Sequence, residues 1–205
     1  MVLIYVDDMI VTGSDSLSLQ KFIKRLHNLL ALKDMGSLRH FLGIEVRRDE
    51  GGMYLTQTRY IEELLKKTEM VNTKPCLTPV VIGKPLTAED RELLQNPTPY
   101  RSIIGALLYL TNTRPDIAFI VNRLSHFMQS PTISHWQGAK RVLHYLKGTR
   151  NMGLHIKFFQ RLDLQSFTDA EYACCLDNRR STAGYCVYLG DTLVSWPSKK
   201  QTVVS

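Results

Sequence analysis

The sequence predicts an α+β fold, in which strands and helices fall in separate stretches of the chain. Three patterns support this class. Two short hairpins occur near the amino end, apolar residues then recur at helical spacing through residues 100–148, and a period of two returns from Met152 onward. Because the strands occur in hairpins and a meander, and residues 100–148 form a helical stretch of their own, the pattern favours α+β.

The composition is that of a globular protein with a basic surface. The 205 residues suffice for one large domain or two small ones, and the net charge of +7 favours an anionic partner, most simply nucleic acid. No apolar run is long enough to span a bilayer, and the apolar amino end lacks the basic lead of a signal peptide. We expect an intracellular chain that is not secreted and has no membrane partner; cytoplasm, nucleus and organelle all stay open.

Cysteine usage agrees with a reducing compartment. The four cysteines form no C-x-x-C pair, and no histidine stands at zinc-finger spacing from them. We expect buried free thiols. They are Cys76, Cys174, Cys175 and Cys186.

The first hairpin carries two adjacent acids. Tyr5-Val6-Asp7-Asp8 lies between two apolar runs, and Gly13-Ser14 ends the second run, which predicts strand, tight turn and strand with both acids at the tip. Neighbouring carboxylates suit the two Mg²⁺ ions, roughly 3.5–4 Å apart, of metal-assisted phosphoryl transfer. The alternative is a solvated turn, because aspartate is a common turn residue.

The next elements are a helix and a second hairpin. Ser14 or Asp15 can cap a helix that runs to about Lys33. The second hairpin is predicted as a strand over Phe41–Arg47, a turn at residues 49–52 and a return strand over Met53–Gln57.

The middle of the chain is predicted to be helical on both sides of a connector. Thr58 starts a short helix, and five prolines in residues 71–99 then predict an extended connector whose Val80, Val81, Ile82 and Leu86 can still pack. Residues 100–148 predict three helices, broken at Pro115 and Pro131. The third carries Lys140, Arg141 and Lys147, which suggest a nucleic-acid-binding face; a bundle helix with a solvated basic face is the alternative.

The last part predicts an antiparallel meander. Its strands are expected at residues 154–158, 162–173, 183–189 and 193–198, with a turn at Gly190-Asp191. Phe167-Thr168-Asp169-Ala170 places an acid inside a predicted central strand, where aspartate is disfavoured. An acid with apolar neighbours at this place calls for a reason, and a strand end that faces solvent is the structural alternative for Asp169.

Ordered blocks along essentially the whole chain resemble the pol polyprotein of copia-type LTR retrotransposons. Any one block is a weak signal, whereas the ordered series is specific. The blocks include Tyr5-Val6-Asp7-Asp8, Lys33-Asp34-Met35-Gly36, Phe41-Leu42-Gly43-Ile44, Tyr100-Arg101-Ser102-Ile103-Ile104-Gly105, Thr113-Arg114-Pro115-Asp116, Ala139-Lys140-Arg141-Val142-Leu143, Asp169-Ala170 and Arg179-Arg180-Ser181-Thr182-Ala183-Gly184-Tyr185.

The resemblance implies roles for individual residues. Asp7 and Asp8 match the Mg²⁺-binding pair of the reverse transcriptase palm, which performs RNA-directed DNA synthesis, and Asp169 matches the first metal-binding, catalytic acid of ribonuclease H. Two further sets match positions that contact the primer–template. They are Tyr5 and Val6 beside the acids, and Phe41, Leu42 and Gly43 in the primer grip.

The resemblance also implies a domain order and partners. Residues 1–70 correspond to a palm remnant and the start of the thumb, 71–99 to a proline-rich connector, 100–150 to a helical thumb and connection, and 151–205 to a truncated ribonuclease H-like domain with an incomplete antiparallel sheet. The implied partners are an RNA or DNA primer–template and the remaining parts of the pol polyprotein.

The expected catalytic sets are incomplete in this chain. In the family a further palm aspartate lies on an upstream strand, and the next ribonuclease H carboxylate is expected just beyond Ser205. We therefore expect a reverse transcriptase fragment that is inactive alone. A non-catalytic nucleic-acid-binding module and a decayed element without present function are the alternatives.

Overall fold

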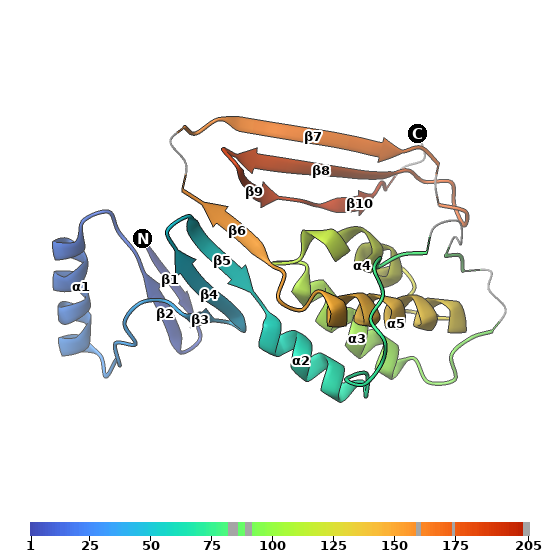
Figure 1. Cartoon of the computed structure of the whole chain (residues 1–205), viewed down its shortest axis with the longest axis horizontal. Helices are drawn as coiled ribbons and strands as arrows, with labels where there is room; N and C mark the ends of the chain where they lie inside the picture. The colour runs from blue at the N-terminus through green and yellow to red at the C-terminus, as the bar shows by residue number, and fades with distance from the viewer. Residues whose placement is uncertain (82–85, 89–91, 159–160, 174, 203–205) are drawn as a thin grey trace. The chain divides into compact units, whose positions relative to one another are not determined.

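The computed structural model describes residues 1–81, 86–88, 92–158, 161–173 and 175–202. It has the mixed α+β composition that the sequence predicts (Figure 1). The chain divides into two compact units, Met1–Leu42 and Gly43–Ser205, which are described separately. In the described residues, no helix has the length and apolar character needed to cross a membrane.

The first unit is a hairpin followed by one helix and a short strand. Strands β1 (Val2–Tyr5) and β2 (Asp8–Val11) pair antiparallel, as predicted. Helix α1 (Ser16–Leu29) begins after Asp15, whose carboxylate accepts hydrogen bonds from the amides of residues 17 and 18, and β3 (His40–Phe41) ends the unit.

Helix α1 is shorter and more exposed than the sequence predicts. It ends at Leu29 rather than near Lys33, because Leu30 is already extended. The apolar stripe of α1 contains no buried residue, and Leu29 is 76% exposed. The apolar residues of α1 recur at helical spacing, but in this unit they do not form a packed core.

The second unit begins with a three-stranded antiparallel arrangement. Strands β4 (Ile44–Asp49) and β5 (Gly52–Thr56) form the second hairpin, and β6 (Leu154–Lys157) pairs with β5. The expected strand over Phe41–Arg47 is interrupted, because Leu42 and Gly43 turn the chain with φ of 49° and 74°. The expectation that residues 154–158 join the carboxyl-terminal meander is wrong, since their backbone pairs with β5.

The main core is helical, as the apolar periodicity predicts. It is built by α2 (Thr58–Lys67), α3 (Thr98–Leu110), the 3-10 turn η1 (Pro115–Ile117), α4 (Ala118–Ser125) and α5 (Ile133–Gly148). Helix α5 contacts α2, α3 and α4 (Figure 1). Among the described residues, seventeen apolar side chains are buried in this cluster, including Ile61, Leu64 and Leu65 of α2.

The connector has no helix or strand over residues 71–81 and 86–88. It ends earlier than predicted, because Leu93 forms an isolated bridge with Thr132 and α3 begins at Thr98. Val80 and Leu86 pack against the core as expected, whereas Val81 is 48% exposed and Ile82 lies outside the described residues. His144 Nδ1 is hydrogen-bonded to the Lys74 carbonyl at 2.7 Å, so α5 holds the connector by polar contacts as well.

The carboxyl-terminal strands form a second antiparallel sheet. Strands β7 (Leu164–Glu171), β9 (Thr192–Ser195) and β10 (Ser198–Lys200) all pair with β8 (Thr182–Leu189). The turn at Gly190-Asp191 is confirmed. Strand β7 is not central as expected: within the described part of the chain it pairs only with β8, and all its residues are exposed.

Three of the four cysteines fall in the described residues and are free thiols, as predicted. They are half-buried rather than buried. Cys174 lies outside the described residues. The three are Cys76, Cys175 and Cys186.

Candidate functional site

The tip of the first hairpin carries both predicted metal ligands. The register pairs Tyr5 with Asp8, so that Val6 and Asp7 form the turn and Asp8 is the first residue of β2. Both acids are exposed, and within the described residues neither forms a side-chain hydrogen bond or an ion pair. Their oxygens are open to a ligand from solvent.

Backbone strain marks the same tip. Val6 has a φ of 49°, which a β-branched residue adopts only at a cost of about 1–3 kcal/mol. Such outliers cluster at functional sites, where the surrounding structure holds them. The sequence does not reveal the positive φ of Val6, because valine and its apolar neighbours are typical of an ordinary strand.

The donor chemistry of the tip fits part of a Mg²⁺ site. Carboxylate oxygens are the ligands that Mg²⁺ prefers, and Mg²⁺ demands near-octahedral geometry with several oxygens. Across the described ranges, no group of three or more His, Cys, Asp or Glu side chains is placed to hold a metal ion. The hairpin thus offers two of the carboxylates that a two-metal site requires.

The other residues predicted near the acids fall into two places. Tyr5 and Val6 flank the acids and are exposed by 56% and 80%. Phe41 ends β3, and Leu42 and Gly43 form the turn into β4. A side chain at Gly43 would be strained by its positive φ and would lie 3.4 Å from the Tyr109 hydroxyl.

The predicted basic residues of α5 have different surroundings. Lys140 is exposed, and its Nζ lies 5.3 Å from the centre of the Trp136 ring. Arg141 Nη2 donates to Thr78 Oγ1 at 2.8 Å, and Lys147 Nζ donates to the Thr73 carbonyl. Arg141 and Lys147 therefore attach the connector to α5, a role that helical spacing does not reveal.

Asp169 lies on the exposed edge strand β7, opposite Gly184 of β8. One of its oxygens accepts a hydrogen bond from the Ala170 amide at 2.9 Å. Among the described residues, Asp169 belongs to no group of three or more His, Cys, Asp or Glu side chains that could hold a metal ion. Its catalytic role stays a prediction.

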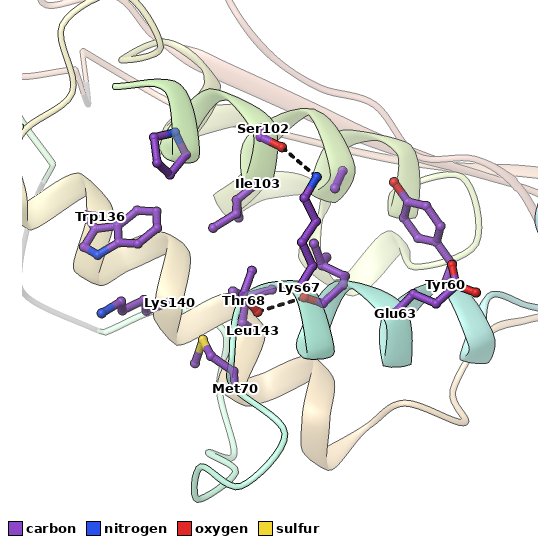
Figure 2. Close-up of a pocket in the computed structure, with 13 residues that line it drawn as sticks. Tyr60, Glu63, Lys67, Thr68, Met70, Ser102, Ile103, Trp136, Lys140 and Leu143 are labelled. Atoms are coloured by element: carbon purple, nitrogen blue, oxygen red, sulfur yellow. Dashed lines mark hydrogen bonds between the residues drawn. The ribbon is translucent and has the colours of Figure 1, made fainter. Parts of the chain in front are cut away.

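The structure has a hollow among the helices of the second unit, which the sequence did not predict. It has a volume of about 300 Å³ and lies between α2, α3 and α5, where Trp136, Lys67 and Ile103 are among its lining residues (Figure 2). The sequence gives one signal for it, an indole within an otherwise aliphatic helical stripe. Three elements distant in sequence form it, so periodicity could not locate it.

Comparison with known proteins shows which class of protein the first part of the chain matches. The family model described as "Reverse transcriptase (RNA-dependent DNA polymerase)" matches residues 1–82, which include the hairpin and its two acids. No solved structure matches the chain significantly.

Curated relatives extend the match along almost the whole chain. The retrovirus-related Pol polyproteins from transposons RE1 and RE2 of Arabidopsis thaliana are 45% and 44% identical over 97% of this chain, which spans 14% of each polyprotein. An uncharacterised mitochondrial protein of the same plant is 40% identical over 99% of this chain and 84% of its own length. The chain belongs to the family of copia-type retrotransposon Pol polyproteins.

Proposed function

We propose that this chain is a reverse transcriptase segment in which Asp7 and Asp8 hold Mg²⁺ for RNA-directed DNA synthesis. The main support for this proposal is the hairpin, which lies in the matched residues 1–82 and carries two consecutive, exposed aspartates at a strained tip. When bound, Mg²⁺ supplies positive charge that stabilises the phosphoryl group during transfer. The contribution of the chain is to fix the two oxygen ligands on a strand end.

The domain assignment follows from this proposal. Residues 1–70 act as palm and start of the thumb, 71–99 as a connector, 100–150 as thumb and connection, and 151–205 as part of a ribonuclease H-like domain. The buried cluster of α2 with α3, α4 and α5 supports a role in holding nucleic acid, since it gives these helices a common packed core. Phe41, Leu42 and Gly43 correspond to the primer grip.

The 205-residue chain does not extend a primer by itself in this proposal. Two carboxylates leave Mg²⁺ without the further protein ligand that positions it, and misplacing the reacting groups costs much of the rate. The rest of the Pol polyprotein supplies that ligand. The same reasoning applies to ribonuclease H chemistry, for which Asp169 alone is an incomplete ligand set.

A chimera tests the proposal directly. Residues 1–205 replace the aligned segment of the RE1 Pol polyprotein, and primer extension is measured with Mg²⁺ on an RNA template. We expect extension by the chimera and none by the isolated chain. The double variant Asp7→Asn/Asp8→Asn in the chimera should lose at least about a thousandfold in rate, because it removes the metal ligands.

The matched control is Asp34→Asn, the same chemical change in the same unit. Asp34 accepts a hydrogen bond from the Gly36 amide and lies outside the hairpin. It should retain the activity of the chimera. Equal activity of the Asp7→Asn/Asp8→Asn chimera and the Asp34→Asn chimera would refute the metal role of the hairpin.

A further inference from the structure

The hollow between α2, α3 and α5 combines an aromatic wall with two ammonium groups (Figure 2). Trp136 is half-buried on α5, next to Lys140. Lys67, in the last turn of α2, reaches toward α3, where its Nζ donates to Ser102 Oγ at 3.3 Å. One such bond uses one of three ammonium donors, so Lys67 can still bind an anion.

The inside of the hollow is apolar. Ile103 and Leu143 are 5% and 0% exposed and line it together with the Trp136 ring. The volume of about 300 Å³ lies at the lower end of the usual range for ligand pockets. A single aromatic base is small enough for such a volume.

The charges around the hollow favour an anionic ligand. The chain carries a net charge of +7, and Lys67 and Lys140 are both exposed at this hollow. Glu63 is the one acid among the described lining residues. Figure 2 shows Glu63 next to Tyr60 and away from Trp136 and Lys140.

We propose that this hollow binds one unpaired base of a single-stranded nucleic acid. The base packs against Trp136, and the phosphates on either side of the base lie on Lys67 and Lys140. Stacking on an aromatic side chain beside a positively charged groove is how proteins bind single strands without sequence preference. The inference rests on the proposed nucleic-acid substrate, but it does not involve Asp7 or Asp8.

Fluorescence of Trp136 tests the inference. The chain has two tryptophans, so Trp196→Phe leaves Trp136 as the sole emitter. An oligodeoxythymidylate of about eight nucleotides should quench this emission, and a strand of equal length with abasic sugars should bind roughly tenfold or more weakly, because it lacks the stacked base. Equal binding and quenching by the two strands would overturn the proposal.

Two neighbouring lysines on α2 provide a matched pair. Lys66 and Lys67 are both exposed in the last turn, but only Lys67 is among the lining residues. Lys67→Ala should weaken binding of the thymidylate strand several-fold more than Lys66→Ala does. Anisotropy of a labelled strand gives this comparison in the natural background, without Trp196→Phe.

Two further outcomes would overturn the proposal: equal effects of Lys66→Ala and Lys67→Ala, or quenching by polyglutamate as strong as that by the thymidylate strand, which would indicate an acidic protein partner. Strand binding is measured on the 205-residue chain, whereas the polymerase proposal is tested by primer extension in the chimera. Failure of the base pocket and failure of the polymerase proposal are therefore separate results.

Discussion

Arg114 is a buried charged residue in the helical core of the second unit, where hydrogen bonds and an ion pair stabilise its guanidinium. Its side chain is 1% exposed, and its guanidinium donates twice to Asp116, at 2.9 and 2.7 Å, and twice to Thr149, at 2.9 and 2.7 Å. The Tyr145 hydroxyl donates to the same carboxylate at 2.8 Å. This network joins the start of η1 to the end of α5, so it fixes two chain segments that are distant in sequence.

Replacing Arg114 should therefore destabilise the fold strongly. Arg114→Met removes both guanidinium donors of the Asp116 carboxylate and the donor of the Thr149 carbonyl. Loss of one partner of a buried pair costs about 3–5 kcal/mol. Urea unfolding followed by circular dichroism measures the change. Arg150→Met is the control, because Arg150 is about half exposed and its contact with Glu62 is 4.0 Å long. A loss as small as that in the control would contradict the account.

The Asp116 carboxylate should also make stability depend on pH. Burial raises the pKa of Asp116, but the hydrogen bond and charge of Arg114 and the Tyr145 hydroxyl outweigh burial, and the pKa lies below its ordinary value of 3.8. A carboxylate whose pKa is lower in the folded than in the unfolded state stabilises the fold at pH values above its unfolded-state pKa, near 4. This stabilisation is lost as the pH falls through the folded-state pKa.

The expected result is a stability difference that shrinks in acid. Unfolding free energies of the wild type and Asp116→Asn, measured from about pH 6 to about pH 3, should converge as the pH falls. A constant difference over this range would show that the pKa of Asp116 is not depressed by folding.

At the scale of elements, local patterns predicted the helices well and strand partners poorly. The prolines at 115 and 131 break the helical stretch as expected, because proline lacks an amide donor and its ring clashes with the preceding turn. Residues 154–157 were correctly predicted as a strand, but alternation does not specify a pairing partner, and they pair with β5. The Leu42-Gly43 turn was missed because it lies within an apolar run.

In the candidate site too, features formed by neighbouring residues were predictable from the sequence, and features formed by distant segments were not. The hairpin tip was predictable because its residues are adjacent in sequence. The contacts of Arg141 with Thr78 and of Lys147 with Thr73 join segments more than sixty residues apart, which a helical pattern cannot show. The position of Asp169 on an edge strand also depended on long-range pairing.

The second hairpin offers a test at this scale. Gly52 has a φ of 150°, and a Cβ there would lie 2.2 Å from the Ile156 carbonyl oxygen of β6. Gly52→Ala should thus disturb the β5–β6 pairing and destabilise the chain by about 1–3 kcal/mol.

Gly51→Ala is the neighbouring control, since its Cβ would meet only an Asp49 carboxylate oxygen at 3.4 Å. Thermal unfolding of both variants measures the difference. Equal midpoints would mean that the β5–β6 register is not as described.

At the scale of the whole molecule, the two units differ in their cores. The unit Met1–Leu42 contains no buried residue among its described positions, whereas α3 and α5 bury most of their apolar stripes. Local opening is easiest where few apolar contacts oppose it. The unit that carries the proposed metal ligands is thus the less stable one in this chain.

Hydrogen exchange measures this difference. Amides of β1, β2 and α1 should exchange at least about a hundredfold faster than those in the middle of α3 and α5, because the latter open only with the core. Mass spectrometry of peptides from the exchanged chain gives both rates in one sample. Equal protection of the two units would show that the first unit has a core of its own.

The most direct test of the central claim is the position at which a divalent metal binds. Mn²⁺ added to the chain should broaden the NMR signals of the Asp7 and Asp8 amides first, with reversal by excess Mg²⁺ and loss of the effect in Asp7→Asn/Asp8→Asn. The account predicts this result even for weak binding, since broadening reports location. Unchanged Asp7 and Asp8 signals, while signals of other exposed acids such as Asp191 broaden, would contradict it.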